Sequence, residues 1–141
     1  MLVIDANIAV KLITIEPGRE EVFDRIENEA ILIAPDWMLV EVGHVLWRKV
    51  KLGLMNREAA ELCLEKLPAF FESLVGAAPL AGAAQRLAFE LDHWIYDCFY
   101  LALAIERGAP LLTADRKFWN AAKRAGYGGS IELQTWADQQ L

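Results

Sequence analysis

The sequence predicts an α/β fold, in which helices cover both faces of a central, mainly parallel sheet of about four to five strands. Three short and mostly apolar runs carry this prediction, because continuous apolar segments are typical of strands buried on both faces. They are Leu2–Ile4, Ile31–Ile33 and Leu111–Thr113. Helical segments alternate with them, which indicates a parallel sheet. The length of 141 residues is normal for one domain, so we expect a single domain over residues 1–141.

In the N-terminal half, proline, glycine and capping residues separate the predicted elements. Pro17 and Gly18 break the first helix, and Pro35 stops the second strand. Asp36 and Asn56 are the expected N-caps of the two helices that follow. In chain order we predict the strand Leu2–Ile4, a helix from Asn7 to about Ile13, an amphipathic helix over Arg19–Asn28, the strand Ile31–Ile33, a helix from Asp36 to about Lys51, and a helix from Asn56 to Leu67.

The same kinds of residue divide the C-terminal half. Pro79 opens a helix, Asp92 is the expected N-cap of the next one, and Gly108 and Gly126 end two helices. In chain order we predict a weak strand near Leu74–Ala78, a helix from about Leu80 to Leu91, a helix from about His93 to Arg107, the strand Leu111–Thr113, a helix over Arg116–Ala125, and a short strand at Ile131–Leu133.

Charge and cysteine content limit the setting in which the protein works. The net charge of −6 argues against a nucleic-acid binder, unless part of the negative charge lies in a cleft where metal ions reverse it. Cys63 and Cys98 lie far apart and indicate buried thiols in a reducing cytosol. The chain meets Asp5 too early for a signal peptide, and no apolar stretch is long enough to cross a bilayer. We therefore expect a cytoplasmic protein with no membrane association.

Two of the predicted strands end in an acid. Asp5 directly follows the first strand, and Asp115 follows the strand Leu111–Thr113 after one alanine. In open parallel sheets, functional sites form beyond the carboxyl ends of the strands, so both acids lie where a site is expected. Either acid alone is more often the N-cap of the following helix than a functional group.

Two further acids face inward from predicted helices. Glu41 is spaced four residues from both Trp37 and Val45, and Asp97 is spaced four residues from Leu101, so each lies on an apolar stripe. An inward-facing carboxylate loses hydration energy and persists only with a partner. Neither helix offers a basic residue close to its acid. The alternative partner is a cation bound from solution.

If the four acids converge, their mutual repulsion points to divalent metal. Two carboxylates about 4 Å apart repel by roughly 4 kcal/mol at an effective dielectric constant near 20. Hard divalent cations with oxygen ligands relieve this repulsion, and all-carboxylate coordination suits Mg²⁺ or Mn²⁺ rather than zinc. Such a site is suited to phosphoryl chemistry, because the metal lowers the pKa of a bound water and stabilises charge on the phosphate.

Four segments that contain these acids resemble the PIN-domain family, most closely the ribonuclease toxins of VapBC-type toxin–antitoxin modules. The resemblance covers essentially the whole chain, and four motifs in the family's order are specific although each alone is weak. The segments are Val3-Ile4-Asp5-Ala6-Asn7, Trp37-Met38-Leu39-Val40-Glu41-Val42, Tyr96-Asp97-Cys98-Phe99-Tyr100-Leu101-Ala102-Leu103-Ala104, and Leu112-Thr113-Ala114-Asp115.

The resemblance implies a three-layer α/β/α PIN-like fold and an endoribonuclease that depends on Mg²⁺ or Mn²⁺. It implies that metal-activated water cleaves RNA and leaves a 5′-phosphate and a 3′-hydroxyl. It also implies a homodimer and a small VapB-like antitoxin whose C-terminal segment fills the cleft. The residues to which it assigns metal binding and catalysis are Asp5, Glu41, Asp97 and Asp115, with Asn7 and Thr113 orienting the first and last acids.

The sequence departs from the toxins just after the last acid. Arg116 and Lys117 follow Asp115, where the toxins often carry another acid or polar group, so one and two metal ions are both compatible with the site. Arg116 and Lys117 are candidates for contact with a substrate phosphate, as is Lys11 on the first helix. We interpret His44 and His93 as structural, since a metal-activated water needs no histidine base.

Two other functions remain open at this point. The first is a Mg²⁺-dependent phosphatase or phospho-acceptor domain, which also begins with a strand that ends in Asp. Here Ala6 and Asn7 follow Asp5, where those proteins need a second acid. The second is a non-catalytic PIN-like module that binds a partner, and the complete set of four acids argues against it.

Overall fold

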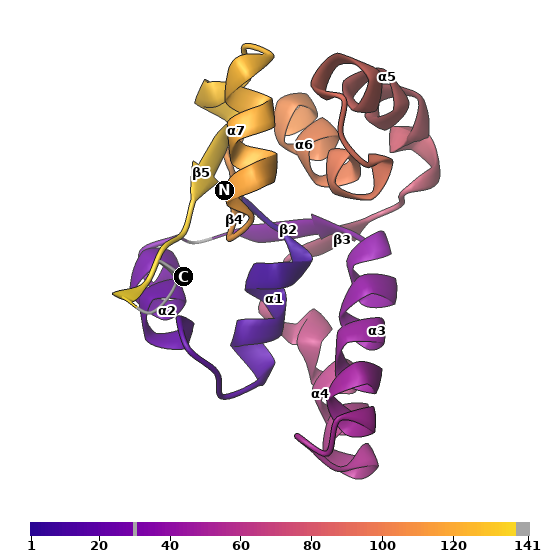
Figure 1. The fold of residues 1–141 in the computed structure, drawn as a ribbon, viewed down its shortest axis with the longest axis vertical. Coiled ribbons are helices and arrows are strands. Elements are labelled where there is room, and N and C mark those ends of the chain that lie inside the picture. Colours follow the sequence, from indigo (N-terminus) through magenta and orange to yellow (C-terminus); the bar gives the residue numbers. More distant parts are fainter. Residues whose placement is uncertain (30, 138–141) are drawn as a thin grey trace.

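The computed structural model describes residues 1–29 and 31–137 and has three layers, with a sheet between two groups of helices (Figure 1). The helices are α1 (Ala6–Ile13), α2 (Arg19–Ile26), α3 (Trp37–Lys51), α4 (Arg57–Lys66), α5 (Ala81–Leu91), α6 (Ile95–Arg107) and α7 (Arg116–Arg124). Figure 1 shows α1 to α4 on one side of the sheet and α5 to α7 on the other. This arrangement confirms the predicted α/β/α layering.

The sheet has five strands, all parallel, in the spatial order β3-β2-β1-β4-β5. The strands are β1 (Leu2–Ile4), β2 (Leu32–Pro35), β3 (Ser73–Val75), β4 (Leu111–Thr113) and β5 (Ile131–Leu133). Val3 of β1 pairs with Ile33 on one side and with Leu111 on the other. The first strand is therefore central, and the carboxyl ends of β1 and β4 are neighbours.

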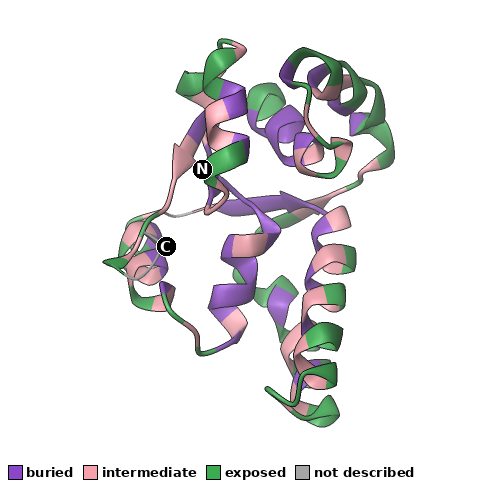
Figure 2. Ribbon diagram, viewed as in Figure 1, coloured by how far each residue is buried: buried purple, intermediate pink, exposed green. Residues whose placement is uncertain are grey.

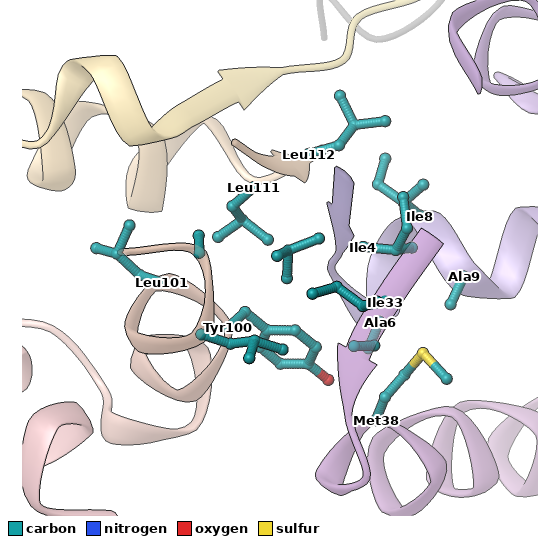
Figure 3. Close-up of a cluster of buried hydrophobic side chains, with 14 of the residues drawn as sticks. Ile4, Ala6, Ile8, Ala9, Ile33, Met38, Tyr100, Leu101, Leu111 and Leu112 are labelled. Carbon is teal, nitrogen blue, oxygen red and sulfur yellow. The ribbon is translucent and has the colours of Figure 1, made fainter. Parts of the chain in front are cut away.

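The buried residues among the described ones form one hydrophobic core around the central strands (Figure 2). Every residue of β1, β2 and β4 is buried, whereas β3 and β5 lie at the edges and are partly exposed. This pattern is the reason that the central strands appear in the sequence as continuous apolar runs. Figure 3 shows side chains from α1, α3 and α6 packing around these strands, with the ring of Tyr100 among them.

One predicted helix cap is confirmed in position only, and another is wrong. Asp36 is the N-cap residue of α3, but its side chain makes no capping hydrogen bond; its Oδ1 accepts instead from the backbone N–H of Ala77, 3.0 Å away. Asp92 adopts the left-handed conformation with φ of 50° and ends α5, and α6 begins only at Ile95. His93 therefore lies in the turn between two helices and not in the first turn of α6.

The two cysteines are free thiols, as the sequence predicts. Cys98 is buried in α6, and burial together with the charge of Asp97 raises its thiol pKa to about 12. Such a thiol stays protonated and unreactive at neutral pH. In residues 1–29 and 31–137, the helices are all too short or too polar to span a membrane.

Candidate metal centre

The strand order brings Asp5 and Asp115 to the same edge of the sheet. Asp5 follows β1 and Asp115 follows the adjacent parallel strand β4, so both lie beyond neighbouring carboxyl ends. Both also cap helices: Asp5 accepts from the N–H of Ala6 at 2.7 Å, and Asp115 accepts from the N–H of Phe118 at 3.1 Å. Capping and a place in the acidic cluster are thus compatible roles for the same carboxylates.

Thr113 and Asn7 connect the two strand ends, as the sequence resemblance implied for small polar residues at these positions. The Thr113 hydroxyl donates to Asp5 Oδ2 at 2.7 Å and accepts from the N–H of Asp115 at 3.1 Å. Asn7 Nδ2 donates to Thr113 Oγ1 at 3.2 Å, and Asn7 Oδ1 accepts from the N–H of Ala114 at 3.0 Å. These hydrogen bonds hold the side chain of Asp5 in one position, and the residue is only 2% exposed.

Glu41 and Asp97 enter the site from opposite layers of the fold. Glu41 lies on α3 and Asp97 in the first turn of α6. Tyr100, one turn further along α6, donates its hydroxyl to Glu41 Oε1 at 2.7 Å and so joins the two helices across the end of the sheet. Figure 3 shows the Tyr100 ring extending from α6 with its hydroxyl at the end remote from that helix.

The pKa values of three carboxyls are raised, and like charge contributes to each. Burial raises the pKa of Asp5 well above its usual value, and the charges of Asp97 and Glu41 raise it further against the hydrogen bond from Thr113. Burial likewise raises the pKa of Glu41 to about 6, opposed by the Tyr100 hydrogen bond and assisted by Asp97. For Asp97, burial raises the pKa, His93 lowers it and Asp115 raises it. Asp97 therefore interacts with each of the other three acids.

Two hollows open at this cluster and share Glu41 and Asp97. One, of about 370 Å³, is lined by Asp5, Asn7 and the first half of α3, including His44. The other, of about 430 Å³, is lined by Asp115, Lys117 and the turn before α6. A larger hollow of about 470 Å³ between α3 and α4 is lined mainly by apolar side chains, and no acid of the cluster reaches it. The acidic cluster is the better candidate for chemistry.

His93 lies within the acidic cluster, although the sequence favoured a structural role for it. Its Nε2 lies 2.7 Å from Asp97 Oδ2. Ligand atoms of His93, Asp97 and Asp115 all lie within 4.8 Å of one another. The spacing of four residues between His93 and Asp97 was the available signal. Its meaning depends on the turn between α5 and α6, which the sequence predicts as part of a helix.

The cationic candidates separate into two groups. Lys11 is buried, and its Nζ lies 2.9 Å from Glu16 Oε1 and 2.6 Å from the carbonyl oxygen of Pro17, with the Trp136 ring 4.1 Å away. Its charge is already paired within the fold, which argues against a phosphate contact by Lys11. Arg116 and Lys117 are exposed in the first turn of α7, and Lys117 lines the same hollow as Asp115.

The donor set fits a divalent cation. Within residues 1–29 and 31–137, neither lysine nor arginine forms an ion pair with any of the four acids. Among the described contacts, His93 beside Asp97 is the basic side chain that pairs with one of these acids. Clustered carboxylate oxygens with raised pKa values are stabilised when a hard cation replaces the protons.

Sequence comparisons relate the chain to one family. The family model of the PIN domain matches residues 2–124. The chain is similar to Ribonuclease VapC3 of Pyrobaculum aerophilum, with 31% identity over 118 residues that cover 82% of this chain and 90% of that protein. It is also similar to Ribonuclease VapC1 of Mycobacterium tuberculosis, with 30% identity over 117 residues, 82% of this chain and 86% of the relative.

Solved structures agree with this relationship. The fold is similar to the crystal structure of PAE2754 from Pyrobaculum aerophilum, with a TM-score of 0.69 and 26% identity, covering 92% of this chain and 81% of that one. It is also similar to the crystal structure of FitAcB from Neisseria gonorrhoeae, with a TM-score of 0.64 over 87% of this chain. At 15% identity the second likeness concerns the fold alone.

Proposed function

The chain belongs to the PIN-domain family, and from this premise we propose that it is a ribonuclease that uses divalent metal, Mg²⁺ or Mn²⁺, held by Asp5, Glu41, Asp97 and Asp115. The observation that carries the proposal is the convergence of these acids from β1, α3, α6 and β4 at one edge of the sheet. Their shared electrostatic strain, expressed in the raised pKa values of Asp5, Glu41 and Asp97, supports metal binding. The VapC relatives support RNA as the substrate class.

The reaction is hydrolysis of a phosphodiester bond. The oxygen of a water molecule bonds to phosphorus, the bond from phosphorus to the 3′ oxygen breaks, and the products are a 5′-phosphate and a 3′-hydroxyl. A bound divalent cation lowers the pKa of water and stabilises the negative charge that develops on the phosphate. The protein supplies the fixed oxygens that hold such a cation beside the substrate.

The surrounding residues hold these oxygens in place. Thr113 and Asn7 fix Asp5, and Tyr100 fixes Glu41, so the cluster changes little when substrate arrives. Lys117, which lines the hollow with Asp115, and the neighbouring Arg116 contact phosphates of the RNA backbone. Their positive charge also offsets the repulsion that a protein of net charge −6 exerts on RNA.

The biological setting we propose follows the VapC relatives. The whole chain, residues 1–141, acts as one catalytic domain in the cytoplasm. It is the toxin of a two-protein module, it forms a homodimer, and a small VapB-like antitoxin inhibits it by covering the acidic cluster. Large apolar side chains that are exposed in the single chain, such as Trp47 at 54% and Phe89 at 80%, support association with other chains.

The burial and the hydrogen bonds of Asp5 argue against a phosphatase or phospho-acceptor role. A phosphate-accepting carboxylate must present an oxygen to the substrate. Asp5 is 2% exposed, and its two oxygens already accept from Ala6 and from Thr113. Asp5 is therefore suited to binding metal from inside the site and not to attack on phosphorus.

Cleavage of total RNA by the purified chain tests the proposal. We expect 5′-phosphate ends to appear with Mn²⁺ or Mg²⁺, and EDTA or Asp97→Asn to abolish them. The matched control is Asp24→Asn, an exposed acid on α2 remote from the cluster, which should cleave like the parent. Equal cleavage by Asp97→Asn and the parent would refute the assignment of the site, and no cleavage with either metal would favour a non-catalytic module.

A further inference from the structure

We propose that His93 is a nitrogen ligand of the metal that Asp97 and Asp115 hold, so that this end of the site selects a first-row transition ion such as Mn²⁺ over Mg²⁺. The inference rests on the proposed function and refines it, because four carboxylates alone would suit either ion. The geometric basis is the group of ligand atoms from these three residues, all within 4.8 Å of one another.

The distances fit one shared ion. Ligand atoms about 2.1 Å from a cation lie about 3.0 Å apart when they are at right angles and about 4.2 Å apart when they are opposite. The observed Nε2 to Oδ2 separation of 2.7 Å and the limit of 4.8 Å for the group bracket these values. Small side-chain rotations are sufficient to bring all three donors to one cation.

The imidazole is held in position from outside the cluster. Its ring stacks on the buried ring of Phe118, with centroids 4.8 Å apart and planes 18° apart, and its side chain is only 8% exposed. The backbone N–H of His93 donates to the carbonyl of Ala88 at 3.1 Å. Phe118 in turn donates its backbone N–H to Asp115 at 3.1 Å. The same residue therefore positions both the imidazole and the last acid.

The chemistry of the donor distinguishes the two ions. Mg²⁺ takes oxygen ligands almost exclusively and keeps much of its hydration, whereas imidazole nitrogen is a good ligand for Mn²⁺ and the later transition ions. A site of one nitrogen and carboxylate oxygens thus binds Mn²⁺ more tightly. A histidine that only oriented Asp97 through a hydrogen bond would show no direct coupling between its nitrogen and the metal.

Pulsed electron paramagnetic resonance of Mn²⁺ bound to the untagged protein tests the inference. Imidazole nitrogen bound to Mn²⁺ modulates the electron spin echo at the frequencies of ¹⁴N. The chain has two histidines, so single substitutions assign the signal. We expect the ¹⁴N modulation in the parent and in His44→Gln, and its loss in His93→Gln. His44 is the other histidine: it is exposed on α3, stacks on Trp47 and lines the hollow that contains Asp5 and Glu41, so the two substitutions decide which imidazole binds the metal.

A second form of the experiment leaves His93 unchanged, in case His93→Gln fails to fold. In His44→Gln protein grown with ¹⁵N-histidine, His93 is the one labelled imidazole, and the modulation should move to the ¹⁵N frequency. In folded His93→Gln protein, calorimetry should show Mn²⁺ affinity reduced tenfold or more, with a smaller change for Mg²⁺.

The outcomes separate this inference from the proposed function. If Mn²⁺ binds without histidine modulation, or if the modulation survives in His93→Gln, the nitrogen ligand is wrong and the carboxylate site stands. If Mn²⁺ does not bind to the parent at millimolar concentration, both the inference and the metal-dependent mechanism are overturned.

Discussion

Asp5 shows how hydrogen bonds offset part of the cost of burying a carboxylate among other acids. Its carboxylate is buried beside two other acids, and three donors, from Ala6, Asn7 and Thr113, accompany it. These hydrogen bonds offset part of the loss of hydration, yet the pKa of Asp5 remains raised. The metal-free cluster is therefore under electrostatic strain, which single substitutions should reveal.

Replacing Glu41 with Gln should stabilise the metal-free protein at neutral pH. The pKa of Glu41 is about 6 in the folded chain against an ordinary 4.5, so the folded state binds this proton more tightly. Protonated Glu41 therefore stabilises the folded state fully below pH 4.5, and this stabilisation is lost as the pH rises through 6. Glu41→Gln, which can still accept from Tyr100, should raise that free energy by about 1–2 kcal/mol at pH 7.5 and little at pH 4.5.

Denaturant melts in EDTA at the two pH values measure this effect. Glu65→Gln, which removes an exposed carboxylate of α4, is the control and should have little effect at either pH. If Glu41→Gln were less stable than the parent at pH 7.5, the ionised Glu41 carboxylate would have a stabilising partner in the metal-free protein. That result would contradict the proposed electrostatic strain.

Thr113→Val should weaken both the fold and metal binding. Valine has nearly the same shape but removes the donor to Asp5 and the acceptor for Asn7 and the N–H of Asp115. We expect a loss of about 1–3 kcal/mol in the free energy of unfolding and a ten- to hundredfold loss of Mn²⁺ affinity. Denaturant melts and calorimetry measure the two effects. Thr113→Ser keeps the hydroxyl and should retain most of the affinity; equal losses in both variants would assign the effect to packing.

At the scale of elements, α7 is the basic helix of an acidic protein. It carries Arg116, Lys117, Lys123 and Arg124 and no acid, and Asp115 is its N-cap. Lys123 lies over the Trp119 ring, 3.8 Å from its centroid, at the end remote from the cluster. The first turn thus brings positive charge to the rim of the candidate site, where an RNA backbone would arrive.

Lys117→Ala should reduce RNA affinity in a salt-dependent way. Losing one phosphate contact lowers the slope of log K against log salt concentration by about 1, largely independent of RNA sequence. Binding of the inactive Asp97→Asn protein to a labelled RNA at several salt concentrations measures the slope. Lys66→Ala, an exposed lysine at the end of α4, should leave the slope unchanged. An unaltered slope for Lys117→Ala would place the RNA path elsewhere.

For the whole molecule, the site depends on elements from both helical layers meeting at one edge of the sheet. Asp5 and Asp115 follow two adjacent strands of the sheet, Glu41 comes from one helical layer and Asp97 from the other. A cation bound by all of them connects the three layers and should stabilise the folded state as a unit.

The melting temperature should therefore rise with metal concentration. Binding to the folded state alone adds about 2.7 kcal/mol at one hundred times the Kd, which corresponds to about 10 °C for a domain of this size. Differential scanning fluorimetry with a Mn²⁺ titration measures the shift, and Asp5→Asn with Asp97→Asn should remove most of it. An equal shift in that double variant would indicate metal binding at another place.

Much of the fold follows from local sequence patterns. The continuous apolar runs identify β1, β2 and β4 because burial on both faces excludes polar residues from them. Inward spacing on two helices singled out Glu41 and Asp97, since an apolar stripe with an acid in it is informative without any coordinates. The predicted helix ends are less accurate. Aspartate is a common N-cap residue, but the Asp36 side chain accepts from the N–H of Ala77 instead of capping α3, and Asp92 ends α5 instead of beginning α6.

The sequence by itself determined the class of fold and its alternating elements, and it singled out the four acids that we propose as the site, because periodicity and burial act over a few neighbouring residues. Only the tertiary structure decided that β1 is central and beside β4, that Lys11 is neutralised within the fold, and that His93 joins Asp97 and Asp115. These facts depend on contacts between segments far apart in the chain, or on the turn between two helices, and both are set by how the layers pack rather than by local propensity.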